Sequence, residues 1–323
     1  MNNNLFITFL FGFILSTLLF VLWIPMLRKL KIGQTIRADG PSEHLKKNGT
    51  PTMGGLIVLI AFTCTFVFAS VFILNLNFNE LLFCVFPLFC YGGIGLIDDI
   101  LIIAKHSNKG VKPLTKVLMQ LISVSMYYFI FNKNFNTNVD IGLFQVDLHH
   151  FYYLFIVLIF VSTTNAVNLT DGLDGLACGL LIISFIGTLI LGLLKKNQIV
   201  CYYSTCIIAS LLGFLMFNHY PAKIFMGNIG SMMLGASLAT LMVILDEEML
   251  LLIIAFVFIV ETVSVIVQVV YFKITHGKRF FKMAPLHHHF EQLGYTEWEI
   301  DFIFWMCAIV TLVFSLIMIL MWG

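Results

Sequence analysis

Charge is the scarcest property of this chain. Only 11% of its 323 residues are Asp, Glu, Lys or Arg, whereas 60% are hydrophobic and the mean hydropathy is +0.98. In a soluble domain roughly a quarter of the residues are charged, so the composition excludes a soluble protein. We predict an all-α, polytopic integral membrane protein, because each backbone amide inside lipid has to be paired within its own segment.

Other signals are absent as well. The seven cysteines all lie in apolar stretches and none forms a CxxC pair, so neither a disulfide nor a cysteine-based zinc site is indicated. There is no internal repeat, low-complexity tract or separate soluble domain, and we expect one transmembrane domain over residues 1–323. The first residues lack the basic start of a cleavable signal peptide, which favours a retained signal-anchor.

Apolar stretches long enough to cross a hydrocarbon core of about 30 Å occur ten times. They run approximately over residues 5–27, 53–74, 81–97, 114–131, 151–167, 176–194, 199–217, 229–245, 249–272 and 302–322. With the N-terminus outside, fifteen of the 18 Lys and Arg residues fall in cytoplasmic segments. This positive-inside bias predicts the orientation, and it places the polar motifs described below at the cytoplasmic face.

Two acidic motifs point to a cation or a polar ligand. Asp98 and Asp99 end the third stretch, and adjacent carboxylates repel each other unless a metal ion, a substrate cation or a proton relieves them. Asn168, Asp171 and Asp174 are spaced three residues apart among glycines, which allow close approach of a ligand. An ordinary solvated acid pair and a plain Asx-rich turn remain the respective alternatives.

Basic and glycine-rich segments complement these acids. Residues 278–291 place three successive histidines near Lys278, Arg279 and Lys282, a cationic surface suited to phosphates. A zinc site is less consistent, because consecutive histidines point in different directions, and a solvated basic loop remains open. The glycine-rich segment 49–55 offers backbone N–H groups to a phosphate. Acids for a divalent metal and cations for phosphates together predict phosphoryl transfer to a lipid phosphate.

Five segments carry a resemblance to a known family. They are residues 44–55, 98–99, 165–175, 225–227 and 283–291. Through them the chain resembles the phospho-N-acetylmuramoyl-pentapeptide transferases, within the wider superfamily of polyprenyl-phosphate sugar-1-phosphate transferases. The triple-histidine segment is the part typical of the muramoyl-pentapeptide branch.

The resemblance implies an Mg²⁺-dependent reaction in a bacterial plasma membrane. UDP-N-acetylmuramoyl-pentapeptide and undecaprenyl phosphate would give lipid I and UMP, a step of peptidoglycan biosynthesis on which cell shape and division depend. It also implies a homodimer of ten-helix protomers with a hydrophobic groove for the lipid, and no nucleic-acid partner.

Residue roles follow from the same resemblance. The implied catalytic residues are Asp98, which would deprotonate or position the lipid phosphate, Asp99, Asp171, His287 and His288. The implied substrate-binding residues are Lys47, Lys116, Asn168, Gly172, Leu173, Asp174, Asn218, Phe225, Gln268 and His289. The implied metal ligands are Asp171 and Asn228.

Two positions depart from the family pattern. The family has an aspartate metal ligand where this chain has Asn228, which removes one negative charge and should weaken binding of a hard dication. The family has a lysine where this chain has Ile102, with Lys105 one turn further on. A weakly active or non-catalytic paralogue is therefore an alternative function. A transferase for another UDP-amino sugar and a transporter are the others, although clustering of the polar motifs at one surface disfavours a transporter.

Overall fold

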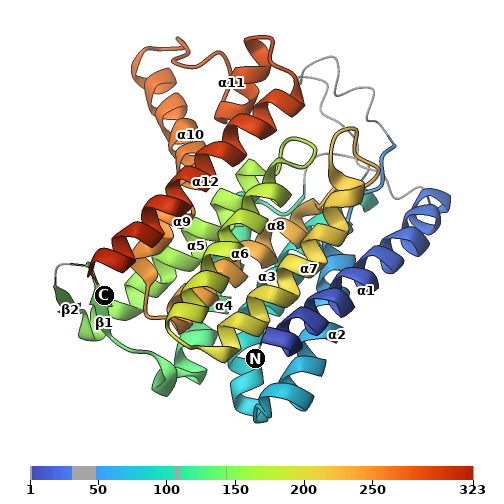
Figure 1. Ribbon diagram of the computed structural model, residues 1–323. Coiled ribbons are helices and arrows are strands. Elements are labelled where there is room, and N and C mark those ends of the chain that lie inside the picture. Colours follow the sequence, from blue (N-terminus) through green and yellow to red (C-terminus); the bar gives the residue numbers. More distant parts are fainter. Residues whose placement is uncertain (1, 31–48, 106–109, 143, 323) are drawn as a thin grey trace.

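The computed structural model describes residues 2–30, 49–105, 110–142 and 144–322, and these ranges form a helical bundle (Figure 1). Its helices are α1 (Asn2–Lys29), α2 (Gly54–Ala69, continued by one wider turn to Leu74), α3 (Phe78–Ala104), α4 (Pro113–Ile130), α5 (Tyr152–Thr170), α6 (Leu176–Leu194), α7 (Gln198–Asn218), α8 (Gly227–Ile244), α9 (Leu251–Ile254), α10 (Phe256–Ile274), α11 (Leu286–Gln292) and α12 (Glu297–Trp322). The all-α prediction is confirmed.

The predicted membrane crossings agree with these helices. Within the described ranges, nine helical segments are long and apolar enough to span a membrane. The remaining predicted stretch forms α4, whose mean hydropathy is lowered by Lys116 and Gln120. Both termini lie at the same end of the bundle, which is the arrangement that the ten predicted crossings require (Figure 1).

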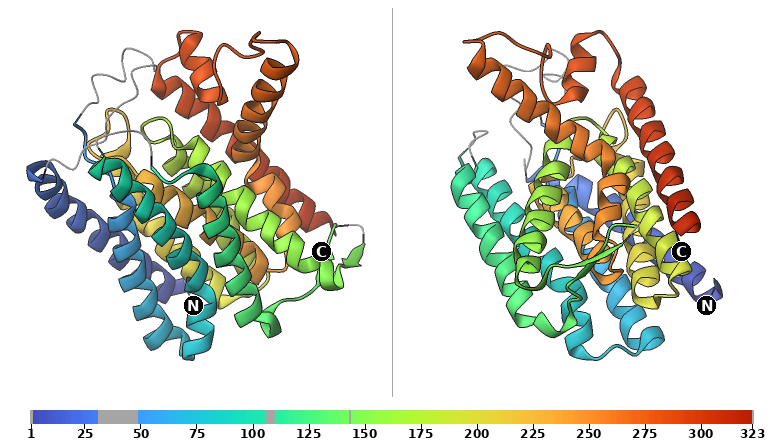
Figure 2. Two further views of the ribbon diagram at one scale, coloured as in Figure 1. Left: turned by 180° about the vertical axis from the view of Figure 1, so that it is seen from behind. Right: turned by 90° about the vertical axis from the view of Figure 1, so that its left-hand side faces the viewer.

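The predicted stretch 249–272 is not one continuous helix, and this part of the prediction is wrong. It is divided into α9 and α10, with Ala255 between them. The hydroxyl of Ser184 donates to the carbonyl of Ile254 at 3.2 Å, so the end of α9 has a polar partner inside the bundle. Beyond the break, α10 extends past the rest of the bundle together with α11 and the beginning of α12 (Figure 2).

A small β-hairpin is a second feature that the apolar periodicity did not predict. Strands β1 (Asn138–Asp140) and β2 (Gln145–Asp147) pair antiparallel, with Val139 opposite Val146. The hairpin lies toward the end of the bundle that holds the termini (Figure 1). It connects α4 to α5 on the side away from α11.

Helix α8 forms the centre of the bundle. It packs against α2, α3, α5 and α6, and nearly all of its side chains are buried. By contrast, α1, α4, α10 and α12 turn many large apolar side chains outward, as helices that face lipid do. The first residues of α8 are therefore surrounded by the ends of other helices, and the polar motifs meet there.

Candidate active site

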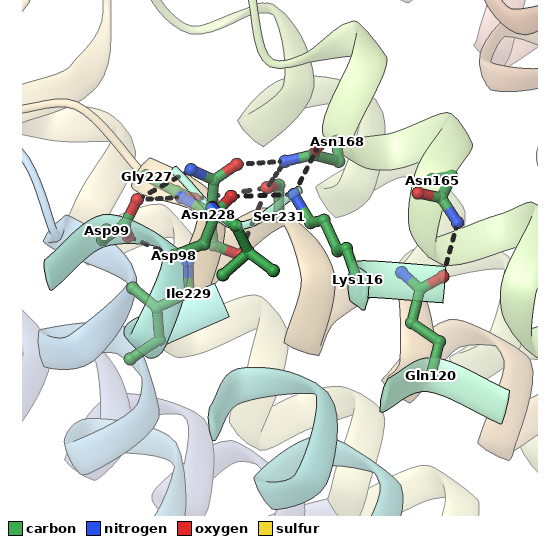
Figure 3. A network of polar contacts seen from close by, with 11 residues as sticks. Asp98, Asp99, Lys116, Gln120, Asn165, Asn168, Gly227, Asn228, Ile229 and Ser231 are labelled. Carbon is green, nitrogen blue, oxygen red and sulfur yellow. Dashed lines mark hydrogen bonds and ion pairs between the residues drawn. The ribbon is translucent and has the colours of Figure 1, made fainter. Parts of the chain in front are cut away.

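The N-terminus of α8 is held by the side chain of Asp99, which is buried at the end of α3. The Asp99 carboxylate accepts the backbone N–H groups of Asn228 and Ile229, both at 3.0 Å, and the side-chain amide of Asn228 at 2.9 Å (Figure 3). A carboxylate is stabilised at this place because a helix N-terminus carries partial positive charge. Gly227 has φ +78°, and a Cβ there would lie 2.7 Å from the Asp99 carboxylate. A glycine is needed at this position.

Asp98 points to a different partner. Its carboxylate forms an ion pair of 2.9 Å with the Lys116 ammonium from the first turn of α4, and it accepts the Val111 N–H at 2.6 Å. The same ammonium lies 3.5 Å from the side-chain oxygen of Asn168 on α5 (Figure 3). The counter-charge that the acid pair required is therefore supplied by a residue of the next helix.

Asn168 and Asn228 connect α5 to α8. The Asn168 side-chain amide donates to the side-chain oxygen of Asn228 at 2.7 Å and to the Ser231 hydroxyl at 2.8 Å (Figure 3). Asn228 thus donates to Asp99 and accepts from Asn168 at the same time. Ser231 was not predicted, and its position one turn after Asn228 on α8 is the signal that would have found it.

The turn between α5 and α6 carries Asp171 and Asp174. Burial, followed by the nearby Asp99 and Asp174 carboxylates, raises the pKa of Asp171 to about 7. Asp174 accepts the Ala222 N–H at 2.9 Å, and its own N–H donates to Glu297 at 3.1 Å. Glu297, at the start of α12, was also missed, because its contact with this turn depends on the tertiary fold.

The histidine segment differs from the cationic surface expected of it. His287, at the start of α11, is completely buried, whereas His288 and His289 are partly buried. His288 Nδ1 lies 2.6 Å from Glu291, and His289 Nδ1 accepts the Lys282 N–H at 3.1 Å. The physical reason for burying His287 is a carboxylate on α10, which is described below.

The other predicted residues shape the loops around the network. Gln268 accepts the N–H groups of Phe280 and Phe281, and Asn218 donates to the Ile224 carbonyl at 3.0 Å. Phe225 is linked through its backbone to Pro51 and Gly54, and Leu173 is buried in the core. Within the described ranges, no hydrogen bond joins Gln268 or His289 to the Asp98–Asn228 network. Lys47 lies outside the described residues.

The arrangement offers oxygen ligands for a hard divalent cation, although no three His, Cys, Asp or Glu side chains among the described residues lie close enough to hold one by themselves. Burial and then the nearby Asp99 carboxylate raise the pKa of Asp171, and no hydrogen bond to the Asp171 carboxylate is found among the described residues. The Asp99 carboxylate has roughly four acceptor positions and uses three of them. Carboxylate and amide oxygens are the ligands that Mg²⁺ takes in proteins, and Asp99, its hydrogen-bond partner Asn228 and the nearby Asp171 carry such oxygens. Lys116 adds a cation for phosphate.

Comparison with known proteins defines the class. Residues 80–246 match the model of the glycosyl transferase family 4, and residues 47–59 match the phospho-N-acetylmuramoyl-pentapeptide-transferase signature 1. This fold with this site is that of a membrane-embedded glycosyl transferase.

Individual relatives narrow the class further. The phospho-N-acetylmuramoyl-pentapeptide-transferase of Staphylococcus carnosus is 42% identical over 95% of this chain and 97% of its own length. That of Limosilactobacillus fermentum is 45% identical over 94% of each chain. At this identity and coverage, the chain belongs to the phospho-N-acetylmuramoyl-pentapeptide transferase family.

Proposed function

We propose that this protein transfers phospho-N-acetylmuramoyl-pentapeptide from its UDP-linked donor to undecaprenyl phosphate, with release of UMP and formation of lipid I. The relatives named above carry this activity in their names, and they match nearly the whole chain. In the reaction, an oxygen of the lipid phosphate attacks the sugar-linked phosphorus of the donor. The bond between this phosphorus and the oxygen that bridges it to UMP breaks, and UMP is released.

The observation that carries the proposal is the convergence of the ends of three helices on the start of α8. Asp99 from α3, Lys116 from α4 and Asn168 from α5 all reach Asn228 directly or through one partner. In phosphoryl transfer, catalysis consists mainly of positioning the phosphates and neutralising their charge. A buried cluster of acids with one lysine, at the end of a membrane bundle, supplies both for a lipid-linked phosphate.

Lys116 and Asp98 are suited to the acceptor phosphate. A phosphate that enters the site competes with Asp98 for the Lys116 ammonium, since both are anions within reach of one cation. When Lys116 turns to the phosphate, the Asp98 carboxylate loses its counter-charge and is free to take a proton from the phosphate. One movement of a side chain thereby binds the acceptor and prepares its oxygen for attack.

Asp99, Asp171 and Asn228 are the residues that would hold Mg²⁺. The bound ion would neutralise the diphosphate of the donor. The protein's own contribution is to keep Asp99 fixed on the α8 N-terminus, so that the carboxylate is already oriented when the donor binds.

Release of UMP by the purified protein tests the proposal. With UDP-N-acetylmuramoyl-pentapeptide and undecaprenyl phosphate we expect UMP in the presence of Mg²⁺ and none after EDTA treatment. UDP-N-acetylglucosamine serves as the control donor and should give no UMP. Release from the control donor alone would instead support the transferase for another UDP-amino sugar.

A weakly active paralogue is the second candidate function, and Asn228 favours it. Both ends of the Asn228 amide are already engaged, with Asp99 and with Asn168, so the site is held together without an ion. An aspartate at this position would face the Asp99 carboxylate and would repel it unless a divalent cation lay between them.

The variant Asn228→Asp separates the two candidates. We expect its melting temperature to fall in EDTA and to recover with Mg²⁺, whereas that of the wild type changes little. If its rate of UMP release exceeds that of the wild type by orders of magnitude, the natural chain is impaired. Equal rates at saturating Mg²⁺ support the full enzyme.

The same proposal places the site at the cytoplasmic face, with the N-terminus outside, in a homodimer. Single cysteines introduced at exposed Lys112 and at Gln145 in the hairpin should react with a membrane-impermeant maleimide from opposite sides of the membrane. Reaction of both from the same side contradicts the orientation. Cross-linking in native membranes reports the dimer.

A further inference from the structure

A buried carboxylate on α10 has no role in the site described so far. Glu261 is completely inaccessible to solvent, within a helix made largely of apolar residues. A charged group inside a membrane bundle is costly unless it is paired, and such groups are usually tied to function. Its partner is His287, which is equally buried.

Both oxygens of Glu261 are taken by this one histidine. The backbone N–H of His287 donates to one carboxylate oxygen at 3.1 Å, and the ring nitrogen Nδ1 lies 3.2 Å from the other. Because a carboxylate only accepts hydrogen bonds, this contact places the ring proton on Nδ1. The two bonds together fix the orientation of the ring and its tautomer. Carboxylates play the same part for catalytic and metal-binding histidines in other proteins.

The other ring nitrogen of His287 is left free. Nε2 is buried and has no hydrogen-bond partner among the described residues. A buried polar atom without a partner is uncommon and marks a place where a ligand belongs. The dyad therefore presents one ring atom, Nε2, to a group that lies in front of it.

Nε2 faces the aspartate turn. A Cβ added at Gly172 would overlap Nε2, so the ring occupies the space that a side chain at this position would need. Gly172 directly follows Asp171, and its φ lies outside the left-handed region. The backbone alone does not require a glycine here. The requirement comes from the histidine, which joins α11 to the turn between α5 and α6.

We infer that Glu261 is a positioning residue of this site, which holds His287 with Nε2 turned toward the Asp171–Gly172 turn and ready for a polar group of the donor. This inference rests on the proposed function and adds a residue to it. Position 172 is a glycine because Nε2 lies there. Glu261 itself touches no substrate.

Gly172→Ala tests the contact. Gly172 is exposed, so a methyl group there would be harmless if the ring did not fill the space. We expect kcat to fall by about 100-fold through displacement of His287, with little change in melting temperature. Gly93→Ala is the matched control, since a Cβ at Gly93 meets no atom within 4 Å, and it should retain wild-type kcat. Equal activity of Gly172→Ala and wild type overturns the inference.

Glu261→Gln tests the tautomer. Glutamine keeps the size of the side chain and accepts the His287 N–H, but its NH₂ group donates to Nδ1 and so moves the ring proton to Nε2. In ¹⁵N spectra of histidine-labelled protein, with His287→Gln to identify the signal, we expect Nδ1–H in the wild type and Nε2–H in Glu261→Gln. We also expect kcat to fall at least tenfold, whereas the KM for the donor changes less than threefold.

Two results contradict the inference. One is an Nε2–H signal in the wild type, and the other is an unchanged kcat in Glu261→Gln despite the reversed tautomer, which would leave Glu261 a purely structural role. The spectra need no turnover. If the wild type releases no UMP while His287 shows the expected tautomer, the proposed function fails and the geometry stands.

Discussion

Acidic side chains lie at both ends of α8, and the two groups differ in their hydrogen-bond partners. At its N-terminus, Asp99 is held by backbone N–H groups, and the neighbouring Asp171 carboxylate is partly buried without a hydrogen bond among the described residues. Beyond its C-terminus, Glu248 accepts the Tyr152 hydroxyl at 2.6 Å, and Glu247 pairs with Lys195. The second set is held mainly by side chains of the protein itself, although the other Glu248 oxygen, Oε2, has no hydrogen-bond partner among the described residues.

The difference separates a ligand site from a structural cluster. Glu248 is linked by Tyr152 to α5, and the Lys195 ammonium also donates to the Leu245 carbonyl at 2.8 Å, so both acids hold the connection after α8 in place. At the other end, Asp171 lies near enough to the Asp99 carboxylate for that charge to help raise its pKa, and among the described residues no cation pairs with either acid. Burial alone does not distinguish function from structure, but the partners do.

Asp171→Ala should have the largest effect in this comparison. Loss of the carboxylate that we propose faces the metal and the diphosphate is expected to reduce kcat on the order of 10³-fold or more, since charge neutralisation is the main catalytic contribution. The protein should still fold, because Asp171 has no hydrogen-bond partner among the described residues and its removal relieves repulsion with Asp99. UMP release and melting temperature measure the two effects. Normal product formation by this variant would refute our placement of the site.

Lys116→Met should have an intermediate effect. It removes the counter-charge of Asp98 and the cation proposed for the lipid phosphate, and hydrogen bonds to charged groups are worth about 1.5–3 kcal/mol. We expect the KM for undecaprenyl phosphate to rise by roughly 10- to 100-fold. Lys112→Met, on the exposed side of the same turn, is the control and should leave the KM unchanged. A similar loss in both variants would indicate a general effect of surface charge.

Much of the fold and part of the site were predictable from the sequence. Apolar length and the distribution of lysines predicted the bundle, because lipid imposes helices of a fixed length. Asp98, Asp99 and Asn168 could be found from local motifs. Residues that join the site through tertiary contacts could not be, and these include Ser231 and Glu297.

The main error of the sequence-based prediction concerned His287, which is buried. Three consecutive histidines near lysines indicated a cationic surface suited to phosphates, and only the position of Glu261 on another helix shows that the first of them is buried. The break at Ala255 was missed for a similar reason. The hydroxyl that satisfies the Ile254 carbonyl comes from α6, which is distant in the sequence.

Glu248→Gln should have the smallest effect on activity and a pH-dependent effect on stability. Burial raises the pKa of Glu248 to about 7 from an ordinary value of 4.5. The folded protein therefore binds a proton that the unfolded chain has lost between these two values, and the stability of the wild type falls as the pH rises from about 4.5 to 7. The shift corresponds to at most about 3 kcal/mol. Glutamine does not ionise, so the variant should have a higher melting temperature than the wild type between pH 5 and pH 8, while UMP release stays unchanged.

Glu247→Gln, which breaks the pair with Lys195, is the control and should not gain stability over this range. A difference between Glu248→Gln and wild type that does not vary with pH would show that the carboxyl is not held protonated, and a loss of activity would show that the two ends of α8 are not independent.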